Sequence, residues 1–396
     1  MKTSRRSFLR TSLSLPALTL GSTVVHALPS RDTSFDPWVE VHPGHLRHNV
    51  GEISRRVEGR PILAVIKNNG YGLGLVNVAS ALQPLQQIAG FAVVKLQEAL
   101  TLRDAQITKP ILLMGPFDEE NLEEMAVRRI TPMVYTPFEA MAERVSRKLQ
   151  NPIAVHVCID TGIGRVGIPY KHAIEYVRSL AALKSVSMKG FMMTFTEDPA
   201  FDKEQLHRFQ SLCASLEHDG IHTGMKHAVS SFGLFQHPDA FLDMVRPGMA
   251  IFGIYPEKEF RGSPHLELRP AVSLKTRVIY VKQLSKGDSA GYNRTYMAQS
   301  DIWVATLPVG HADGVPRVAA KGARVRIGAS LFPVVAISAS HCIVELGVET
   351  RVRMGDVATV FDWQEGSRPE DVAAACGGSV YDLTMHLNPL LPRRMV

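Results

Sequence analysis

Between residues 37 and 262, short apolar runs alternate with amphipathic stretches. Apolar runs of three to seven residues that alternate with helical patterns are typical of parallel strands buried on both faces. Strands are expected at residues 62–66, 88–94, 110–114, 132–135, 153–159, 188–194, 225–229 and 244–246, with helices at 96–102, 121–128, 137–148, 171–183 and 203–218. Eight strands alternating with helices predict an α/β fold, a (β/α)8 barrel; an open doubly wound sheet is the alternative.

The pattern changes near Ser263. From Pro270 onward helical patterns are scarce, and β-rich runs lie at residues 273–284, 302–307, 323–327, 333–337, 343–346 and 358–361. This predicts a cofactor-binding barrel domain over residues 37–262 and a mainly-β domain over 263–396. Residues 37–42 alternate like a strand and are a candidate to join the β-domain.

The first 27 residues have the layout of a twin-arginine export signal. Arg5 and Arg6 precede Phe8 and Leu9, a mild apolar stretch follows, and a small-residue end comes at Ala27. A disordered basic tail would have no reason for that order. We therefore expect residues 1–27 to be removed and the protein to act in the periplasm.

Composition narrows the class further. The 396 residues are 45% hydrophobic and 21% charged, as in a soluble globular protein. The formal charge of +6 falls to about +2 without the four basic residues before residue 11, so no nucleic-acid partner is expected. No other stretch reaches eighteen apolar residues, so no membrane span is expected. The four cysteines favour free thiols, with a Cys342–Cys376 bridge left open.

Lys67 is the main candidate for chemistry. It ends an apolar run and precedes Asn-Asn-Gly-Tyr-Gly-Leu-Gly, so a buried strand delivers one amine into a glycine-rich turn. Burial favours the neutral amine, which is the form that reacts with an aldehyde cofactor. Taken alone, a solvated lysine is the commoner interpretation. A dinucleotide site is disfavoured because the glycines at 70, 72 and 74 lack the required spacing.

The lysine segment resembles the cofactor-lysine motif of the alanine racemase family, the fold-type III pyridoxal 5′-phosphate enzymes. Five further segments match the family in order, at residues 38–49, 159–167, 244–253, 290–296 and 307–314. The resemblance covers nearly all of the chain after the signal. No His/Asp cluster with metal-ligand spacing is present, so no metal is expected.

The resemblance implies roles for four residues. Lys67 would form the Schiff base with the cofactor and act as one acid/base group, and Tyr292 from a partner subunit would be the other. Arg246 would face the pyridine nitrogen, and His227 would support Arg246. Such a shared site requires a homodimer. Without the resemblance, Tyr292 would be a half-buried sheet tyrosine, Arg246 a barrel-rim arginine and His227 a core histidine.

Further cofactor contacts follow from barrel geometry and from the resemblance. Loops after the seventh and eighth strands hold phosphates in such barrels, which points to Ser231, Gly248 and Met249. The resemblance adds the phenols of Tyr71 and Tyr381. It also implies that Arg165 contacts the phenolic oxygen of the cofactor and orients Tyr292.

Five positions depart from the family pattern. Cys158 stands where a lysine, often carbamylated, is usual, and Ala339 with Ser340 replaces a Met-Asp pair. His311 replaces a tyrosine, and Thr194 stands where a histidine is usual. These residues are expected near the substrate, and the smaller groups among them suggest a wider pocket.

The expected function is interconversion of L- and D-alanine, or of a broader set of amino acids, by a two-base mechanism. The alternatives are a fold-type III decarboxylase or aldolase, a non-catalytic pyridoxal-phosphate carrier, and a degenerate racemase that binds amino acids without turnover. Tyr292 and Arg246 distinguish the racemase from the first alternative, and the β-domain distinguishes it from the second.

Overall fold

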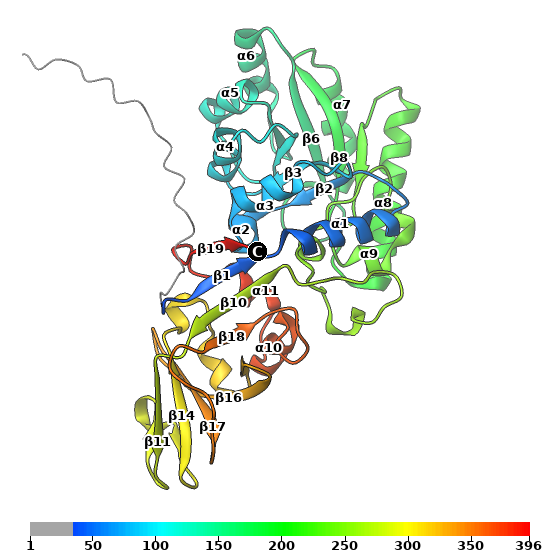
Figure 1. Ribbon diagram of the computed structural model, residues 1–396. Helices are drawn as coiled ribbons and strands as arrows, with labels where there is room; N and C mark the ends of the chain where they lie inside the picture. Colours follow the sequence, from blue (N-terminus) through cyan, green and yellow to red (C-terminus); the bar gives the residue numbers. More distant parts are fainter. Residues whose placement is uncertain (1–34) are drawn as a thin grey trace, which may run out of the picture. The chain divides into compact units, whose positions relative to one another are not determined.

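The computed structural model describes residues 35–396, so the predicted export signal at residues 1–27 lies outside the described part. The N-terminal domain is built on a parallel sheet with the strand order β2-β3-β4-β5-β6-β8-β9, in which β7 pairs with β6. Figure 1 shows this sheet among the helices of the domain. Its strands are β2 (Ile62–Val65), β3 (Ile88–Val93), β4 (Ile111–Leu113), β5 (Ile130–Val134), β6 (Ile153–Asp160), β7 (Ile168–Pro169), β8 (Val186–Met192) and β9 (Met225–His227).

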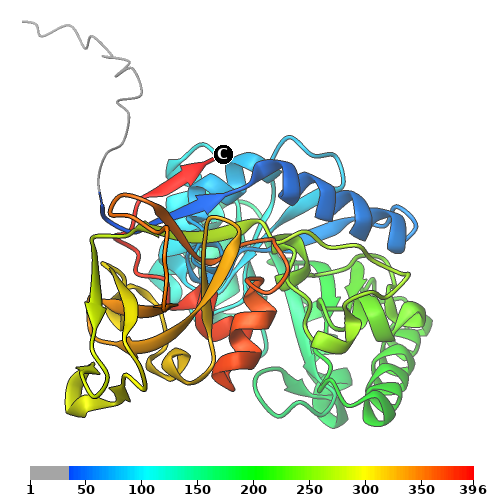
Figure 2. The same cartoon turned by 60° about the horizontal axis from the view of Figure 1, so that its bottom comes forward.

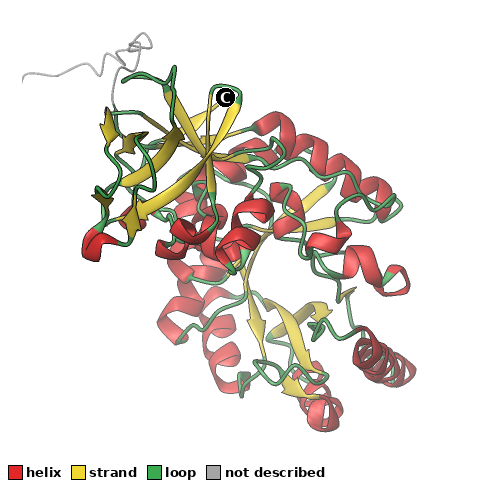
Figure 3. Cartoon of the chain, turned by 90° about the horizontal axis from the view of Figure 1, so that it is seen from below, coloured by secondary structure: helices red, strands yellow, loops and turns green. Residues whose placement is uncertain are grey.

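Helices alternate with these strands along the chain. An amphipathic helix is stable in this position because its apolar face covers the sheet and its polar face meets water. The helices are α1 (Pro43–Arg56), α2 (Lys67–Tyr71), α3 (Leu75–Leu82), α4 (Leu96–Asp104), α5 (Glu119–Val127), α6 (Glu139–Leu149), α7 (Tyr170–Ala181), α8 (Pro199–His218) and α9 (Gly233–Gln236), with 3-10 turns η1 (Pro238–Ala240), η2 (Met249–Phe252) and η3 (Lys258–Phe260). Figure 3 shows these helices around the yellow strands.

The last expected strand closes the barrel without becoming a regular strand. Val245 forms a parallel bridge with Ile62, and its carbonyl accepts the N–H of Leu63 at 2.9 Å. On the other side, the Arg246 N–H donates to the carbonyl of Val229 at 2.8 Å. The segment therefore joins the β9 side to β2, which confirms the barrel and excludes the open sheet.

The C-terminal part is a nine-stranded sheet in the order β11-β14-β17-β16-β15-β18-β10-β1-β19 (Figure 2). Its strands are β1 (Trp38–Val41), β10 (Val272–Arg277), β11 (Tyr280–Leu284), β14 (Ile302–Leu307), β15 (Arg324–Ile327), β16 (Ser330–Ile337), β17 (Cys342–Gly347), β18 (Val357–Phe361) and β19 (Arg393–Met395). A small hairpin (β12, Ser289–Ala290; β13, Tyr296–Met297), turns η4 (Tyr292–Arg294), η5 (His311–Asp313) and η6 (Arg317–Lys321), and helices α10 (Pro369–Cys376) and α11 (Val380–Met385) complete it.

Strand β1 lies in this C-terminal sheet although it precedes the barrel in sequence. It pairs antiparallel with β10, with Val41 opposite Val272, and parallel with β19, with Val39 opposite Arg393. Within residues 35–396 no helix is long and apolar enough to cross a membrane, and no group of three metal-ligating side chains is found. All four cysteines are free thiols.

Candidate active site

A cavity of about 460 Å³ lies at the carboxyl ends of the barrel strands. Its floor is largely apolar, with Val65, Val94, Met114, Met133 and Met192. Its polar lining residues are Lys67, Tyr71, Tyr135, Cys158, Arg165, Thr194, Glu197, Ser230, Ser231, Arg246 and Tyr381. Ligands bind at this end of a (β/α)8 barrel because the loops that follow the strands converge there.

Lys67 begins a turn with left-handed backbone. Asn68, Asn69 and Gly70 have φ of 54°, 56° and 61°, and Tyr71 has φ of 54°. Each left-handed non-glycine residue costs roughly 1–2 kcal/mol. The Asn69 N–H donates to Glu98 Oε1 at 2.9 Å, and Asn69 Oδ1 accepts the Leu75 N–H at 2.9 Å. Asparagine tolerates this conformation better than most residues, which explains the Asn-Asn pair after the lysine.

The C-terminal domain holds the far end of this turn. A Cβ on Gly72 would lie 1.9 Å from the carbonyl oxygen of Thr384 in α11, so only glycine fits. The guanidinium of Arg393, in β19, donates to the Gly72 carbonyl oxygen at 2.9 and 3.1 Å. The position of the Lys67 amine therefore depends on both domains.

Lys67 is surrounded by other cations. Burial, then the nearby guanidiniums of Arg165 and Arg246, lower the pKa of the Lys67 amine, while Glu98 acts in the opposite sense. A lowered pKa leaves more of the amine in the neutral, nucleophilic form. The two guanidiniums on the same cavity also favour an anionic ligand.

The loop that presents Arg165 is folded by the carboxylate of Asp160. Asp160 Oδ1 accepts the N–H groups of Gly162 at 2.9 Å and Gly164 at 3.2 Å. Both glycines have positive φ, of 143° and 67°, so the Asp-Thr-Gly-x-Gly-Arg spacing encodes this turn. Within residues 35–396, Arg165 has no hydrogen bond or ion pair, which leaves its guanidinium available to a ligand.

Arg246 is buried and held by a row of two histidines. Its Nη1 donates to His227 Nδ1 at 2.7 Å, and its Nη2 donates to the Met193 carbonyl at 2.8 Å. His227 Nε2 lies 2.9 Å from His156 Nδ1. Because a guanidinium only donates, His227 Nδ1 must accept, so its Nε2 carries the proton and donates to His156.

Burial and the Arg246 charge keep both histidines neutral. Burial lowers the pKa of His156 to about 4, and that of His227 well below its ordinary value. Burial lowers the pKa of Arg246 to about 10, which still leaves it charged at neutral pH. The row thus places one fixed positive charge at the base of the cavity.

A second group of polar atoms, here called the anion-binding end, lies at the loops after β9 and residue 247. Ser231 Oγ accepts the N–H groups of Gly248 and Ala250, both at 3.1 Å. A Cβ on Gly248 would lie 2.1 Å from the Tyr71 hydroxyl oxygen, so glycine is required for the phenol to reach this end. The ring centroids of Tyr71 and Tyr381 are 6.0 Å apart. Backbone amides and hydroxyls of this kind suit a phosphate.

Comparison with known proteins agrees with this geometry. The model of the alanine racemase N-terminal domain matches residues 41–256, and that of the C-terminal domain matches residues 271–395. An alanine racemase of Methanococcus maripaludis is 33% identical over 367 residues, covering 90% of this chain and 97% of that protein. One from Clostridium tetani is 30% identical, covering 90% and 94%. The chain belongs to the alanine racemase family.

Solved structures of the family share the whole architecture. Alanine racemase from Streptomyces lavendulae superposes with a TM-score of 0.85 at 27% identity, covering 92% of this chain and 97% of that one. Alanine racemase from Bacillus anthracis, solved with bound L-Ala-P, gives 0.82 at 28% identity, covering 92% and 95%. The predicted fold is therefore that of the alanine racemase family.

Most of the predicted site residues gather at this cavity. Ten of them line it: Lys67, Tyr71, Cys158, Arg165, Thr194, Ser231, Arg246, Gly248, Met249 and Tyr381. His227 lies behind Arg246 and is fully buried. The roles predicted for these side chains stay predictions, but the side chains come from distant parts of the sequence, between residues 67 and 381.

Four predicted residues lie elsewhere in the chain. Tyr292 is 80% exposed in η4, and His311, Ala339 and Ser340 are not among the lining residues of the Lys67 cavity. The last three are close to one another, because the N–H groups of His311 and Ala312 donate to the carbonyls of Ser338 at 3.1 Å and Ala339 at 2.9 Å. Their predicted place near a substrate would need a second subunit.

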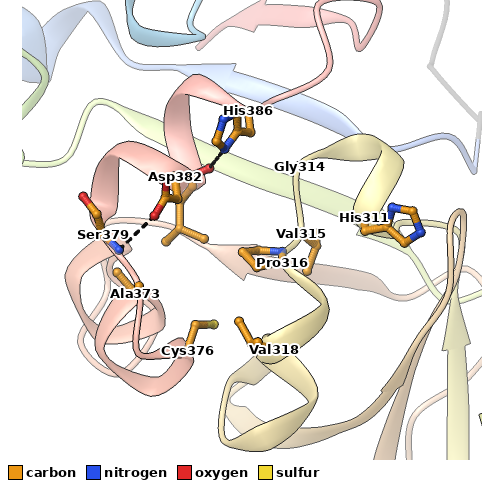
Figure 4. A pocket seen from close by; sticks show the side chains of 12 residues that line it. His311, Gly314, Val315, Pro316, Val318, Ala373, Cys376, Ser379, Asp382 and His386 are labelled. Carbon is orange, nitrogen blue, oxygen red and sulfur yellow. Dashed lines mark hydrogen bonds between the residues drawn. The ribbon is translucent and has the colours of Figure 1, made fainter.

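His311 also borders a separate cavity of about 300 Å³ within the C-terminal domain (Figure 4). Asp382 of α11 and His386, which follows α11, lie on its other side, joined by a hydrogen bond of 3.0 Å from the histidine ring to the Asp382 carbonyl. The His311 ring lies 2.9 Å from a guanidinium nitrogen of Arg317.

Several residues of the site escaped sequence reasoning, among them His156 and Glu197. His156 lies two residues before Cys158 on β6, so the period of two placed both on one face and was a usable signal. A Cβ on Gly190 would lie 2.6 Å from its ring, so that glycine makes room for it. Glu197 also lines the cavity, with φ of 67°. No sequence pattern indicated Glu197, because its placement depends on a loop.

Cys158 supplies no charge to the site. Burial raises the pKa of its thiol to about 11, against the opposing effect of Arg246 and Arg165. A neutral thiol cannot form an ion pair with Arg165, so Cys158 does not supply the negative charge that a carbamylated lysine would carry at this position.

Proposed function

We propose that this protein is a pyridoxal 5′-phosphate-dependent amino-acid racemase that acts on alanine. The observation that carries the proposal is the Lys67 amine, with a lowered pKa, in a cavity that it shares with Arg165, Arg246 and Ser231. The relatives and the solved neighbours are alanine racemases, and the Bacillus anthracis structure holds L-Ala-P. A broader set of amino acids is the second candidate, because Thr194 and Cys158 are smaller than the residues usual at their positions.

The residues present fit the cofactor. The Ser231 hydroxyl, whose oxygen accepts the Gly248 and Ala250 N–H groups, and the Tyr71 hydroxyl form a cradle for a phosphate, and the glycine at 248 leaves room for the Tyr71 hydroxyl. Arg246 lies in the lining of the same cavity and would hold the pyridine nitrogen, while the Lys67 amine would bond to the aldehyde carbon. When bound, the cofactor withdraws electrons from the α-carbon of an attached amino acid and makes its proton acidic.

Arg246 would set the course of the reaction. A guanidinium with a pKa of about 10 stays charged at neutral pH and only donates hydrogen bonds. It therefore leaves the pyridine nitrogen unprotonated, which weakens electron withdrawal and favours proton exchange over decarboxylation. His227 and His156 hold the guanidinium in place and, being neutral, do not compete with its charge.

Racemisation needs two proton-transfer groups, on opposite faces of the α-carbon. The Lys67 amine is one, and its lowered pKa lets it accept a proton near neutral pH. We infer that Tyr292 of a partner subunit is the other, since Tyr292 is 80% exposed and does not line the cavity of its own chain. Its loop packs near Ala336 at the end of β16, close to Ala339. The protein is then a homodimer with shared sites.

Export to the periplasm completes the proposal. It rests on the paired arginines and the apolar stretch of residues 1–27, which lie outside the described residues. Export of an already folded protein suits an enzyme that captures its cofactor in the cytoplasm.

One experiment tests the reaction directly. The purified protein, supplied with pyridoxal 5′-phosphate, is incubated with L-alanine in D2O, and loss of the α-proton is followed by NMR together with formation of D-alanine. We expect exchange with inversion. Exchange without D-alanine would contradict racemisation, and the same measurement on larger amino acids decides the range of substrates.

A further inference from the structure

Glu197 is the one acidic side chain among the residues that line the Lys67 cavity in the described chain. It lies between β8 and α8 and stands near the anion-binding end, with its Oε1 3.5 Å from the hydroxyl of Ser230. The next residue, Ser231, accepts the amides of Gly248 and Ala250. An ionised carboxylate beside this cradle repels an anionic ligand and so weakens its binding.

The position of Glu197 is fixed by its neighbours in sequence. The Thr196 N–H donates to Asp202 Oδ1 at 3.0 Å and to Gln205 Oε1 at 2.9 Å. On the other side, Asp198 caps α8 by accepting the N–H groups of Ala200 and Phe201. Glu197 itself has φ of 67°, a left-handed conformation that a glutamate adopts at a cost. The loop therefore holds the carboxylate at the cavity in spite of local strain.

We propose that Glu197 weakens the binding of the phosphate group of pyridoxal 5′-phosphate by like-charge repulsion, and that protonation of Glu197 relieves it. This rests on the cofactor of the proposed function. The consequence is a cofactor affinity that rises as the pH falls, through a group that takes no part in the chemistry at the α-carbon.

Several neighbouring side chains affect the protonation of Glu197. Burial, then Glu257 beyond η2 and Asp202 of α8, raise the pKa of the Glu197 carboxyl, and only the Ser230 hydroxyl opposes them. Asp202 is itself paired with His237, whose Nε2 lies 2.8 Å away. From α11, Tyr381 faces Glu197, which raises the pKa of this phenol after burial. A bound phosphate would raise the Glu197 pKa further, so its titration moves toward neutral pH.

The test compares cofactor binding by wild type, Glu197→Gln and Glu257→Gln. Dissociation constants for pyridoxal 5′-phosphate and for pyridoxal, which lacks the phosphate, are measured by absorbance or fluorescence from about pH 5 to pH 9. Glu257→Gln removes the same charge from a residue that does not line the cavity. The ionisation of the phosphate and the reaction with Lys67 are common to all three proteins and cancel in the comparison.

We expect Glu197→Gln to bind pyridoxal 5′-phosphate about 3- to 10-fold more tightly than wild type at the alkaline end. The difference should vanish at the acidic end, where Glu197 is protonated, and should be absent for pyridoxal. Equal affinities at alkaline pH, an equal gain with pyridoxal, or an equal gain in Glu257→Gln would each overturn the role of Glu197. Failure of all three proteins to bind either compound would instead overturn the proposed cofactor.

Discussion

The Lys67 turn and the Tyr292 loop carry the two predicted proton-transfer groups and differ in almost every physical respect. Lys67 is half-buried, surrounded by cations and held by hydrogen bonds from the barrel and from the C-terminal domain. Tyr292 is 80% exposed on a two-stranded hairpin and does not line the cavity. One chain thus gathers the residues proposed to hold the cofactor in one cavity, while the proposed second acid/base group lies outside that cavity.

The largest effect is expected from Lys67→Ala. Loss of the amine removes both the bond to the cofactor and one proton carrier, so racemisation should fall by at least about 10⁴-fold. Lys95→Ala is the matched control, because Lys95 also follows a barrel strand but does not line the cavity. Racemisation by Lys67→Ala at more than a hundredth of the wild-type rate would contradict the role of Lys67, and with it the contrast between the Lys67 turn and the Tyr292 loop.

Tyr292→Phe should lower racemisation by about 10²- to 10³-fold, and more in one direction than in the other. Cofactor binding should change little, because the substitution removes only a hydroxyl and the residues proposed to hold the cofactor line the cavity without Tyr292. Tyr280→Phe, at another exposed tyrosine, should have no effect. The α-proton exchange of L- and D-alanine in D2O measures the two directions separately.

Mixed dimers sharpen the same comparison. A dimer of one Lys67→Ala chain and one Tyr292→Phe chain contains one site with both native groups, if Tyr292 acts across the interface. Random mixing of the two inactive proteins should then restore about a quarter of the wild-type activity. If Tyr292 served its own chain, mixing would restore nothing.

Gly72→Ala tests the close contact between the turn after Lys67 and α11 of the C-terminal domain. The added Cβ would lie 1.9 Å from the Thr384 carbonyl oxygen at a φ of 86°, so we expect a loss of about 3–4 kcal/mol in the free energy of unfolding. Gly59→Ala has a φ of 77° and no atom within 4 Å of the new Cβ, so it should cost only about 1–2 kcal/mol. Urea unfolding of both variants measures the difference, and equal losses would refute the contact.

The smallest effect concerns the histidine row behind Arg246. The pKa of His156 falls from 6.5 to about 4 in the folded state, so the unfolded chain binds more protons between these values. Stability should therefore fall as the pH drops from about 6.5 to about 4, by at most about 3 kcal/mol from this group. His156→Asn should flatten that slope, whereas the exposed His172→Asn should leave it unchanged. Parallel slopes for His156→Asn and wild type would contradict the assignment.

The sequence alone determined the class of fold and most of the polar residues that line the Lys67 cavity. Apolar runs at the right spacing predicted the barrel, because a strand buried on both faces must be apolar throughout. The Asn-Asn-Gly-Tyr-Gly and Asp-Thr-Gly-x-Gly-Arg segments also encode their own turns, since few other residues adopt positive φ. Local patterns of this kind survive without knowledge of the rest of the chain.

Only the tertiary structure decided which side chains meet. Thr384 and Arg393 contact Gly72 from more than three hundred residues away, and the His156–His227–Arg246 row draws on three barrel segments. Glu197 reaches the cavity through a loop conformation that no residue type specifies. Charges and hydrogen bonds act over a few ångströms in space, so their partners, and the pKa values that follow, are settled only when the barrel closes and the C-terminal domain docks on it.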